Sequence, residues 1–287
     1  MKRTDIVMLI GAKNCNPNGD PDGDNRPRTT PDFGTGLISK GAISRKIRNY
    51  IQSKYGAEPG CDIYVKAGAI LGQQRLKALT KEGVPLPAND AAKKINPAGR
   101  EAVLHQYYDV RCFGGVLSGS KAVNCGQVTG PVQITMLESI DPITHIDLAI
   151  SRCAAETEDE VKKSIDGTSK TLGSVKAMAY GLYKGVLSVN PILAAETGFS
   201  DSDFDKLKEA LLNLFAIDGS AARPPGSMVV EALFMYEHSS EYGNAQTGKL
   251  LRKVKVERKV ENPASVDDYS ITLDTDLPDG VVFTRLL

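Results

Sequence analysis

Two hydrophobic patterns of different period open the chain. Residues Asp5–Ala12 (DIVMLIGA) form a short, near-continuous apolar run, which is typical of a strand buried on both faces and predicts a central strand. From Ser39, a suitable helix N-cap, to about Lys54, apolar residues instead recur at the i, i+4, i+7, i+8 spacing of one helix face. The residues on that face are Ile43, Ile47, Tyr50 and Ile51. The sequence therefore predicts a strand, a loop and an amphipathic helix.

Later segments repeat the same two patterns. Ser200 can cap a second helix, Asp201–Phe215, whose buried face carries Leu207, Leu211, Leu214 and Phe215. Further helices are predicted over residues 70–81 and 100–111. The predicted strands are 61–66, Gly126–Ile140 paired with His145–Arg152, Tyr180–Asn190, Met228–Tyr236, Leu251–Val260, Ser270–Leu273 and Val281–Thr284.

The order strand, helix, strands, helix, strands predicts an α+β fold. It is compatible with a split βαβ, ferredoxin-like or RRM-like antiparallel sheet that carries helices on one face. We expect a single domain over residues 1–287, because no long linker divides the chain. Residues 57–99 have the character of an insertion, and residues 243–287 add strands whose role the sequence leaves open.

Charge is balanced over the whole chain but not along it. The 287 residues are 41% hydrophobic and 24% charged, as in a folded globular protein, and the 35 Lys and Arg match the 35 Asp and Glu. Residues 1–54, however, contain ten Lys or Arg against five Asp, a net charge of +5. The acidic segments Glu156–Glu160 and Asp201–Asp205 restore the balance, so an acidic face of one copy could meet a basic face of the next.

The remaining composition excludes several classes. No apolar stretch approaches the roughly 20 residues of a membrane helix, and the first residues do not resemble a secretory signal, so we expect a cytoplasmic protein. The sequence contains no GxSxG, Walker, GxGxxG or HExxH motif and predicts no cofactor. An odd number of cysteines without CxxC spacing predicts reduced, mostly buried thiols at Cys15, Cys61, Cys112, Cys125 and Cys153.

A loop rich in Asn, Pro, Gly and Asp, residues 14–36, separates the first strand from the first helix. Its Asn18-x-Asp20-x-Asp22-Gly23 run matches the first half of a calcium loop, but Thr29 stands where the bidentate Glu would be. Carboxylates of Asp20, Asp22 or Asp24 could instead hold Mg²⁺ for phosphodiester cleavage. A metal-dependent endoribonuclease therefore stays open as an alternative function.

The loop and the helix together suit a bound polyanion better. Amide side chains, glycine backbone N–H groups and the helix N-terminus at Ser39–Gly41 can all donate to phosphate oxygens. Positive charge would come from Arg26, Arg28, Arg45, Lys46 and Arg48. The helix side opposite the apolar face carries Arg45, Arg48, Asn49 and Gln52, with Lys46 on its flank, and is expected to be exposed. Such contacts fix the path of a strand without reading its bases.

Several motifs occur in an order that resembles a known family. They are NPNGDPDGDNRPR, SRKIRNYI, DVRCFGGVL, GPVQI, AYGLYKG, ETGFSDSDFDKLKEALLNLF and DGSAAR. In this order and rough spacing the chain resembles the Cascade backbone subunit of type I-C CRISPR systems, within the repeat-associated mysterious protein superfamily.

The resemblance implies a non-catalytic protein with an RRM-like palm and finger and thumb insertions. Several copies would form a helical filament on one CRISPR RNA and present the guide for pairing with target DNA. Its partners would be copies of itself, other Cascade subunits and, indirectly, a recruited nuclease-helicase. By the same resemblance the RNA contacts would be Asn16, Asn18, Asn25, Arg26, Ser39, Arg45, Lys46, Arg48, Arg111, Phe113, Gln127, Lys176 and Arg223.

Overall fold

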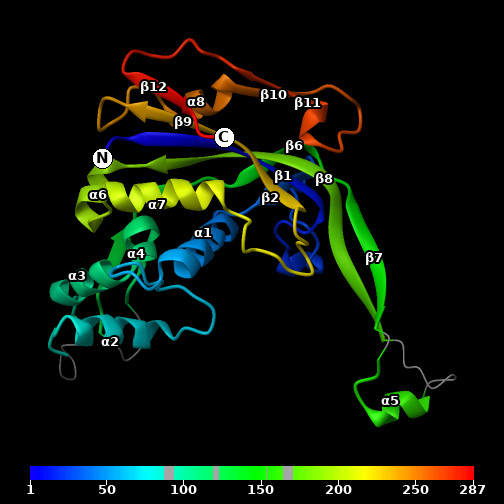
Figure 1. Ribbon diagram of the computed structural model, residues 1–287, viewed down its shortest axis with the longest axis horizontal. Coiled ribbons are helices and arrows are strands. Elements are labelled where there is room, and N and C mark those ends of the chain that lie inside the picture. Colours follow the sequence, from blue (N-terminus) through cyan, green and yellow to red (C-terminus); the bar gives the residue numbers. More distant parts are fainter. Residues whose placement is uncertain (87–93, 119–122, 153, 164–170) are drawn as a thin grey trace.

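An eight-stranded antiparallel sheet organises the molecule (Figure 1). The computed structural model describes residues 1–86, 94–118, 123–152, 154–163 and 171–287. The main path of the sheet has the order β12-β9-β1-β8-β6-β2, and β5 and β7 also pair with β8. Its strands are β1 (Thr4–Cys15), β2 (Thr35–Ile38), β5 (Val132–Ile134), β6 (Leu137–Pro142), β7 (His145–Arg152), β8 (Thr171–Val189), β9 (Met228–His238) and β12 (Val281–Arg285). A large antiparallel sheet with helices is thus confirmed.

Strand β1 lies between two hydrophobic cores. Ile6, Met8 and Ile10 point into the core on one face of the sheet, and Val7 and Leu9 point into the core on the other. All five side chains are buried because β1 pairs with β8 on one side and with β9 on the other. The predicted two-sided burial of this strand is confirmed.

The first face is covered by α1 (Lys40–Tyr55), α6 (Pro191–Thr197) and α7 (Asp201–Leu212) (Figure 1). Both predicted caps are present: Ser39 Oγ accepts a hydrogen bond from Ala42 N, and Ser200 forms a capping box with Asp203. The apolar stripe of α1 is buried as predicted. Helix α7 ends three residues before the predicted Phe215.

The second face is covered by the C-terminal segment, whose role the sequence left open. This segment forms α8 (Thr247–Lys253), the hairpin of β10 (Val254–Arg258) and β11 (Tyr269–Leu273), the short helix η3 (Val266–Asp268), and edge strand β12. Leu250, Val254 and Tyr269 pack into the core formed by this face. The predicted strand Leu251–Val260 is therefore wrong in its first three residues, which are helical, and in its last two, which follow the end of β10. Helices also lie on both faces of the sheet, not on one.

Residues between α1 and β5 gather around a separate core. It is built from α2 (Leu71–Lys81), α3 (Pro97–Gln106), α4 (Tyr108–Phe113) and the paired β3 (Gly114–Val116) and β4 (Gln127–Thr129). The predicted strand 61–66 is wrong, because Asp62 forms one isolated bridge to Tyr107 and its carboxylate binds Lys66 and Lys77. The helix predicted over 100–111 is interrupted at Tyr107, whose backbone is extended. Residues 87–93 of the predicted insertion lie outside the described residues.

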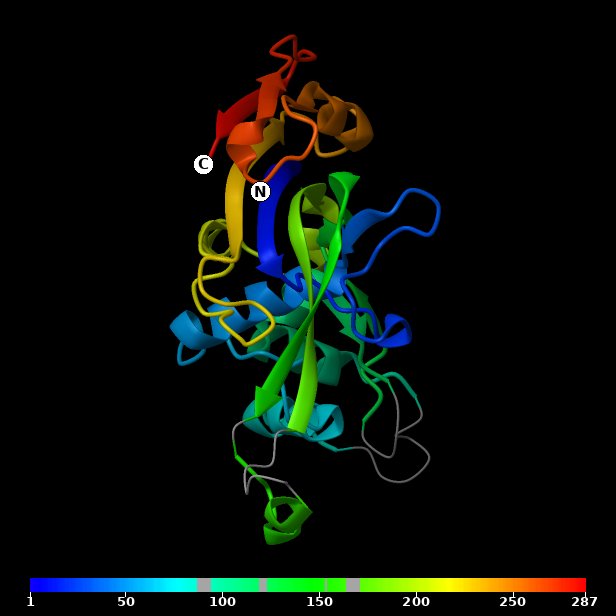
Figure 2. The same ribbon diagram turned by 90° about the vertical axis from the view of Figure 1, so that its right-hand side faces the viewer.

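A long hairpin leaves the sheet (Figure 2). The C-terminal half of β8 pairs with β1, and its N-terminal half pairs with β7. The pairing of β7 with β8 begins at His145 and Met178 and continues away from the sheet, toward α5 (Glu158–Lys163). Strand β7 has the predicted bounds, but it pairs with β8 and not with the expected partner. The expected partner, Gly126–Ile140, is broken into β4, β5 and β6, of which β4 pairs with β3 while β5 and β6 pair with β8.

The described cysteines, Cys15, Cys61, Cys112 and Cys125, are free and buried, as predicted. Cys153 lies outside the described residues. Within the described ranges, no helix has both the length and the apolar character needed to cross a membrane.

Replacing Ile47 by alanine tests the packing of α1 on the sheet. Because Ile47 is fully buried against the first core, Ile47→Ala is expected to lower the free energy of unfolding by about 2–5 kcal/mol. The control Ile217→Ala removes the same atoms from a side chain that is 47% exposed and should change the free energy of unfolding by less than about 0.5 kcal/mol. Chemical denaturation measures both values, and equal losses would contradict the packing described.

Candidate functional site

Three segments far apart in the sequence meet around one cavity of about 310 Å³. The loop after β1, the first turns of α1 and the segment that precedes β9 each line it. Its lining residues are Pro17, Asn18, Gly19, Gly41, Ala42, Arg45, Lys46, Asn49, Asp218 and Arg223. Four of the predicted contacts, Asn18, Arg45, Lys46 and Arg223, are therefore brought together.

Hydrogen bonds hold the predicted loop against α1. Asn18 Oδ1 accepts from Ser39 N at 2.8 Å, which joins the loop to the N-cap of the helix. Asn16, only 3% exposed, donates from Nδ2 to Asn25 O at 2.6 Å and so closes the loop on itself. The backbone of Asn25 has a positive φ of 55°, which asparagine tolerates better than most residues. Asn16, Asn18, Asn25 and Ser39 thus shape the cavity, and Asn18 also lines it.

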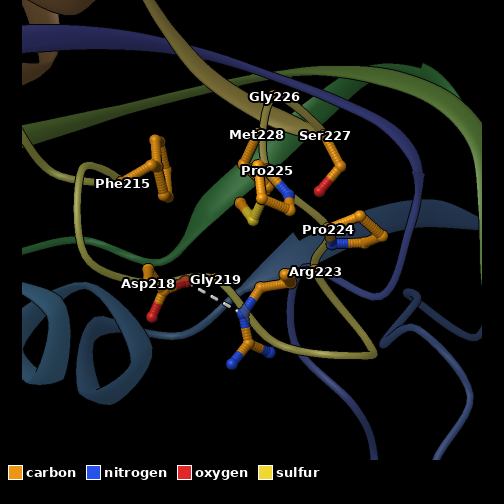
Figure 3. A pocket seen from close by; sticks show the side chains of 9 residues that line it. All are labelled: Phe215, Asp218, Gly219, Arg223, Pro224, Pro225, Gly226, Ser227 and Met228. Atoms are coloured by element: carbon orange, nitrogen blue, oxygen red, sulfur yellow. Dashed lines mark hydrogen bonds and ion pairs between the residues drawn. The ribbon is translucent and has the colours of Figure 1, made fainter.

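Asp218 bridges two of the predicted cations. Its carboxylate accepts a hydrogen bond from Lys46 Nζ and another from Arg223 Nε at 2.9 Å. Figure 3 shows Arg223 and Asp218 linked beside the turn Pro224–Gly226. Lys46 is 4% exposed, and burial lowers its pKa while the hydrogen bond with Asp218 acts in the opposite direction. The expected exposure of Lys46 is therefore wrong, because Asp218 reaches over it from a segment distant in the sequence.

Arg45 is the exposed cation of this cavity. It has no hydrogen-bond or ion-pair partner among the described residues, although it lies on the same helix face as Asn49, which also lines the cavity. The guanidinium offers up to five N–H donors in a planar fork that matches the oxygens of a phosphate. The rim of the cavity can therefore bind an anion without first breaking a described ion pair.

A second cluster joins the loop to the projecting hairpin. Arg26 Nη2 lies 2.6 Å from Asp147 Oδ2 on β7, and Lys176 Nζ on β8 lies 3.2 Å from the same oxygen. Lys176 also pairs with Asp24 at 3.1 Å. The hydrogen bond with Asp147 raises the pKa of Arg26, and the bond from Arg26 lowers the pKa of Asp147. Two further predicted contacts, Arg26 and Lys176, are thus close together but paired with carboxylates.

Arg48 and Phe113 meet on the other side of α1. Arg48 Nε donates to Asp109 Oδ2 at 2.8 Å, and its guanidinium carbon lies 5.0 Å from the centre of the Phe113 ring. Both residues line another cavity, of about 210 Å³, that also borders Gly41.

The carboxylates Asp109, Asp147 and Asp218 were not among the predicted site residues. A signal for two of them existed, since Asp109 and Asp218 begin the motifs DVRCFGGVL and DGSAAR.

Two predicted contacts lie away from both cavities. Arg111 is buried between α4 and α7, where its guanidinium binds both carboxylate oxygens of Asp203 at 2.9 and 3.2 Å. It also donates to Leu104 O at 2.7 Å, so its hydrogen bonds connect elements of the fold. Gln127 is exposed on β4, outside the lining of either cavity.

Two of the three carboxylates of the nuclease alternative, those of Asp20 and Asp24, have partners within the chain. Asp20 caps the short helix η1 (Pro21–Gly23) by accepting from Asp22 N, and Arg28 lies 3.4 Å from the same carboxylate oxygen. Asp24 pairs with Lys176. Within the described ranges, no group of three or more His, Cys, Asp or Glu is placed to hold a metal ion.

Comparisons with known proteins connect these features to one family. Residues 2–274 match the family described as CRISPR-associated protein Cas7. A curated relative of that name from Haloferax volcanii is 37% identical over 120 residues, which are 41% of this chain and 33% of the relative. The match thus spans about a third of the relative's length.

A solved structure with a TM-score above 0.5 has a similar fold at low sequence identity. A chain of a structure described as a CRISPR RNA-guided surveillance complex, pre-nicking, has a TM-score of 0.51 and 16% identity, with 82% of this chain and 78% of that chain covered. A second structure, described as a CRISPR RNA-guided surveillance complex, has a TM-score of 0.45 and 13% identity, with 82% and 68% covered. Because the family match extends from the start of β1 through the end of β11, this chain belongs to the Cas7 family of CRISPR-associated proteins.

Proposed function

We propose that the protein binds CRISPR RNA, independently of sequence, as the non-catalytic repeated backbone subunit of a type I-C surveillance complex. The observation that carries this proposal is the cavity in which the loop, the N-terminus of α1 and Arg223 converge, lined also by Arg45, which has no ion-pair partner in the described part of the chain. Membership of the Cas7 family, and a fold shared with a chain of a CRISPR RNA-guided surveillance complex, support the same proposal.

Phosphate recognition accounts for the chemistry of this cavity. Its described polar groups are the cations Arg45, Lys46 and Arg223, two asparagine amides, the first turn of a helix and the carboxylate of Asp218, which is paired with Lys46 and Arg223. Apart from that carboxylate, these groups bind anions without distinguishing bases. The formal net charge of the whole chain is zero, so attraction to RNA would come from this local group of cations. A carrier of guides with different sequences requires this kind of contact.

The strand order supports an RRM-like palm. Strands β9, β1, β8 and β5 lie in the order expected of a split βαβ fold, with α1 after its first strand and α7 after its third. The separate core over residues 64–128 and the projecting β7–β8 hairpin would be the insertions. We further propose that cytoplasmic copies stack along one RNA beside other Cascade subunits, present the guide to target DNA, and act with a nuclease-helicase only indirectly.

Removing the Arg45 side chain beyond its β-carbon tests the phosphate site. Arg45→Ala should weaken binding similarly for unrelated RNA sequences and reduce the slope of log affinity against log salt by about 0.7, the value for one phosphate contact on a single strand. Fluorescence anisotropy over a salt series measures both quantities.

The matched control is Arg252→Ala, which removes an exposed arginine on α8, on the opposite face of the sheet. It should leave both affinity and salt slope unchanged. If Arg45→Ala binds like the unmodified chain, or weakens only one RNA sequence, the phosphate site is assigned wrongly.

The nuclease alternative makes the opposite prediction about metal ions. Because Asp20 and Asp24 are engaged in a cap and an ion pair, we expect labelled RNA to stay intact with Mg²⁺, Mn²⁺ or Ca²⁺. Gel electrophoresis of the RNA provides the measurement. Metal-dependent cleavage that disappears in Asp20→Ala would overturn the non-catalytic assignment and favour the endoribonuclease.

A further inference from the structure

The cavity beside Arg48 differs in chemistry from the one beside Arg45. Its apolar lining consists of Phe113 together with the buried Val132 and Ile134 of β5. Its polar lining consists of Lys40, Ser44 and Arg48, on one stripe of α1, and of Gln133. A lining of apolar side chains with a few polar groups is typical of a site for a small organic ring, and the cavity volume of about 210 Å³ is below the roughly 300–1,000 Å³ of drug-sized pockets.

Arg48 is fixed in place on one side of this cavity. Its Nε donates to Asp109, which is 1% exposed and is itself held by Tyr64 N at 2.7 Å and Val65 N at 3.1 Å. The guanidinium also lies over the Phe113 ring, with 5.0 Å between its central carbon and the ring centre. A guanidinium whose charge is already matched by a buried carboxylate adds little attraction for phosphate. Its planar, fixed surface is instead suited to stacking.

The two cavities share Gly41, on the first turn of α1. A side chain built at Gly41 would meet only Ser39 Oγ, at 3.8 Å, so the ridge between the cavities is open. A strand whose phosphate contacts Arg45 can therefore cross this ridge and turn a base into the neighbouring cavity.

We propose that this second cavity is a nucleobase subsite, in which one base of the bound RNA stacks on the Arg48 guanidinium. The inference rests on the proposed RNA-binding function and changes the role of Arg48 from phosphate contact to stacking platform. Gln133, which lines the cavity, donates from Nε2 to Gly130 O at 2.8 Å, and its amide oxygen has no described donor, so it can accept a hydrogen bond from the edge of a base. Stacking accepts every base, because every base has a π-face, so the subsite is compatible with guides of any sequence.

The test compares Arg48→Lys with the control Arg45→Lys on two RNAs of equal length, one normal and one with abasic ribose throughout. Lysine keeps the charge but lacks the planar group, so Arg48→Lys should bind normal RNA roughly five- to one-hundred-fold more weakly than the unmodified chain. Arg48→Lys should bind abasic RNA as tightly as the unmodified chain binds it. Arg45→Lys should retain the full preference of the unmodified chain for normal over abasic RNA.

A second measurement needs no variant and therefore does not depend on the folding of Arg48→Lys. RNA that carries 5-iodouracil should form a photochemical crosslink to the unmodified chain at Phe113, located by mass spectrometry of the peptides. Equal binding of normal and abasic RNA by the unmodified chain, or Arg48→Lys weakening both RNAs alike, would overturn the base subsite. If the unmodified chain binds neither RNA, the proposed function itself fails, which is a different result.

Discussion

The burial of β1 on both faces is the constraint on which the rest of the structure depends. Alternate side chains of this strand enter two cores, one closed by α1 and α7 and the other by the C-terminal segment. A one-residue shift in its pairing would exchange the two faces, so its register is strongly fixed. The packing of the sheet thus fixes where β1 ends and where α1 begins, and the hydrogen bond from Ser39 N to Asn18 Oδ1 holds the intervening loop against α1. The position of the candidate site follows from the packing of the sheet.

Carboxylates within the chain decide which cations are available to a polyanion. The pair of Lys46 and Asp218 is buried, and removal of one partner from such a pair typically costs about 3–5 kcal/mol, so Lys46 remains part of the structure when RNA binds. The side chains of Arg26 and Asp147 are 48% and 40% exposed, and exposed ion pairs contribute little to stability, so a phosphate can replace the carboxylate at little cost. Arg45 has no described carboxylate partner that a phosphate would have to replace. The cations of the loop and of α1 thus differ in role, because their partners differ in burial and Arg45 has no described partner.

Local sequence patterns predicted the elements that depend on local interactions. The period of apolar residues identified β1, α1 and α7, and the Ser39 and Ser200 caps were predictable because a cap bonds to residues two or three positions away. The motifs also identified the loop, α1 and Arg223, which the structure brings to one cavity.

Features that depend on distant partners were not predictable in the same way. The break of residues 126–140 into three strands reflects pairing with β3 and β8, and α8 depends on the apolar face that Leu250 covers. The burial of Lys46 depends on Asp218, 172 positions along the chain, and no periodicity records that contact. The sequence therefore indicated four residues that line the cavity, but not the carboxylates that pair with some of the predicted cations and leave Arg45 without a described partner.

We propose that copies of this chain assemble on RNA through phosphate contacts. The most direct test is to purify the protein with and without co-expressed CRISPR RNA and to record its absorbance ratio at 260 and 280 nm and its mass by light scattering. We predict a nuclease-resistant ribonucleoprotein whose mass increases in steps with RNA length. A chain that remains free of RNA in both preparations, even when neighbouring subunits are supplied, would contradict this claim.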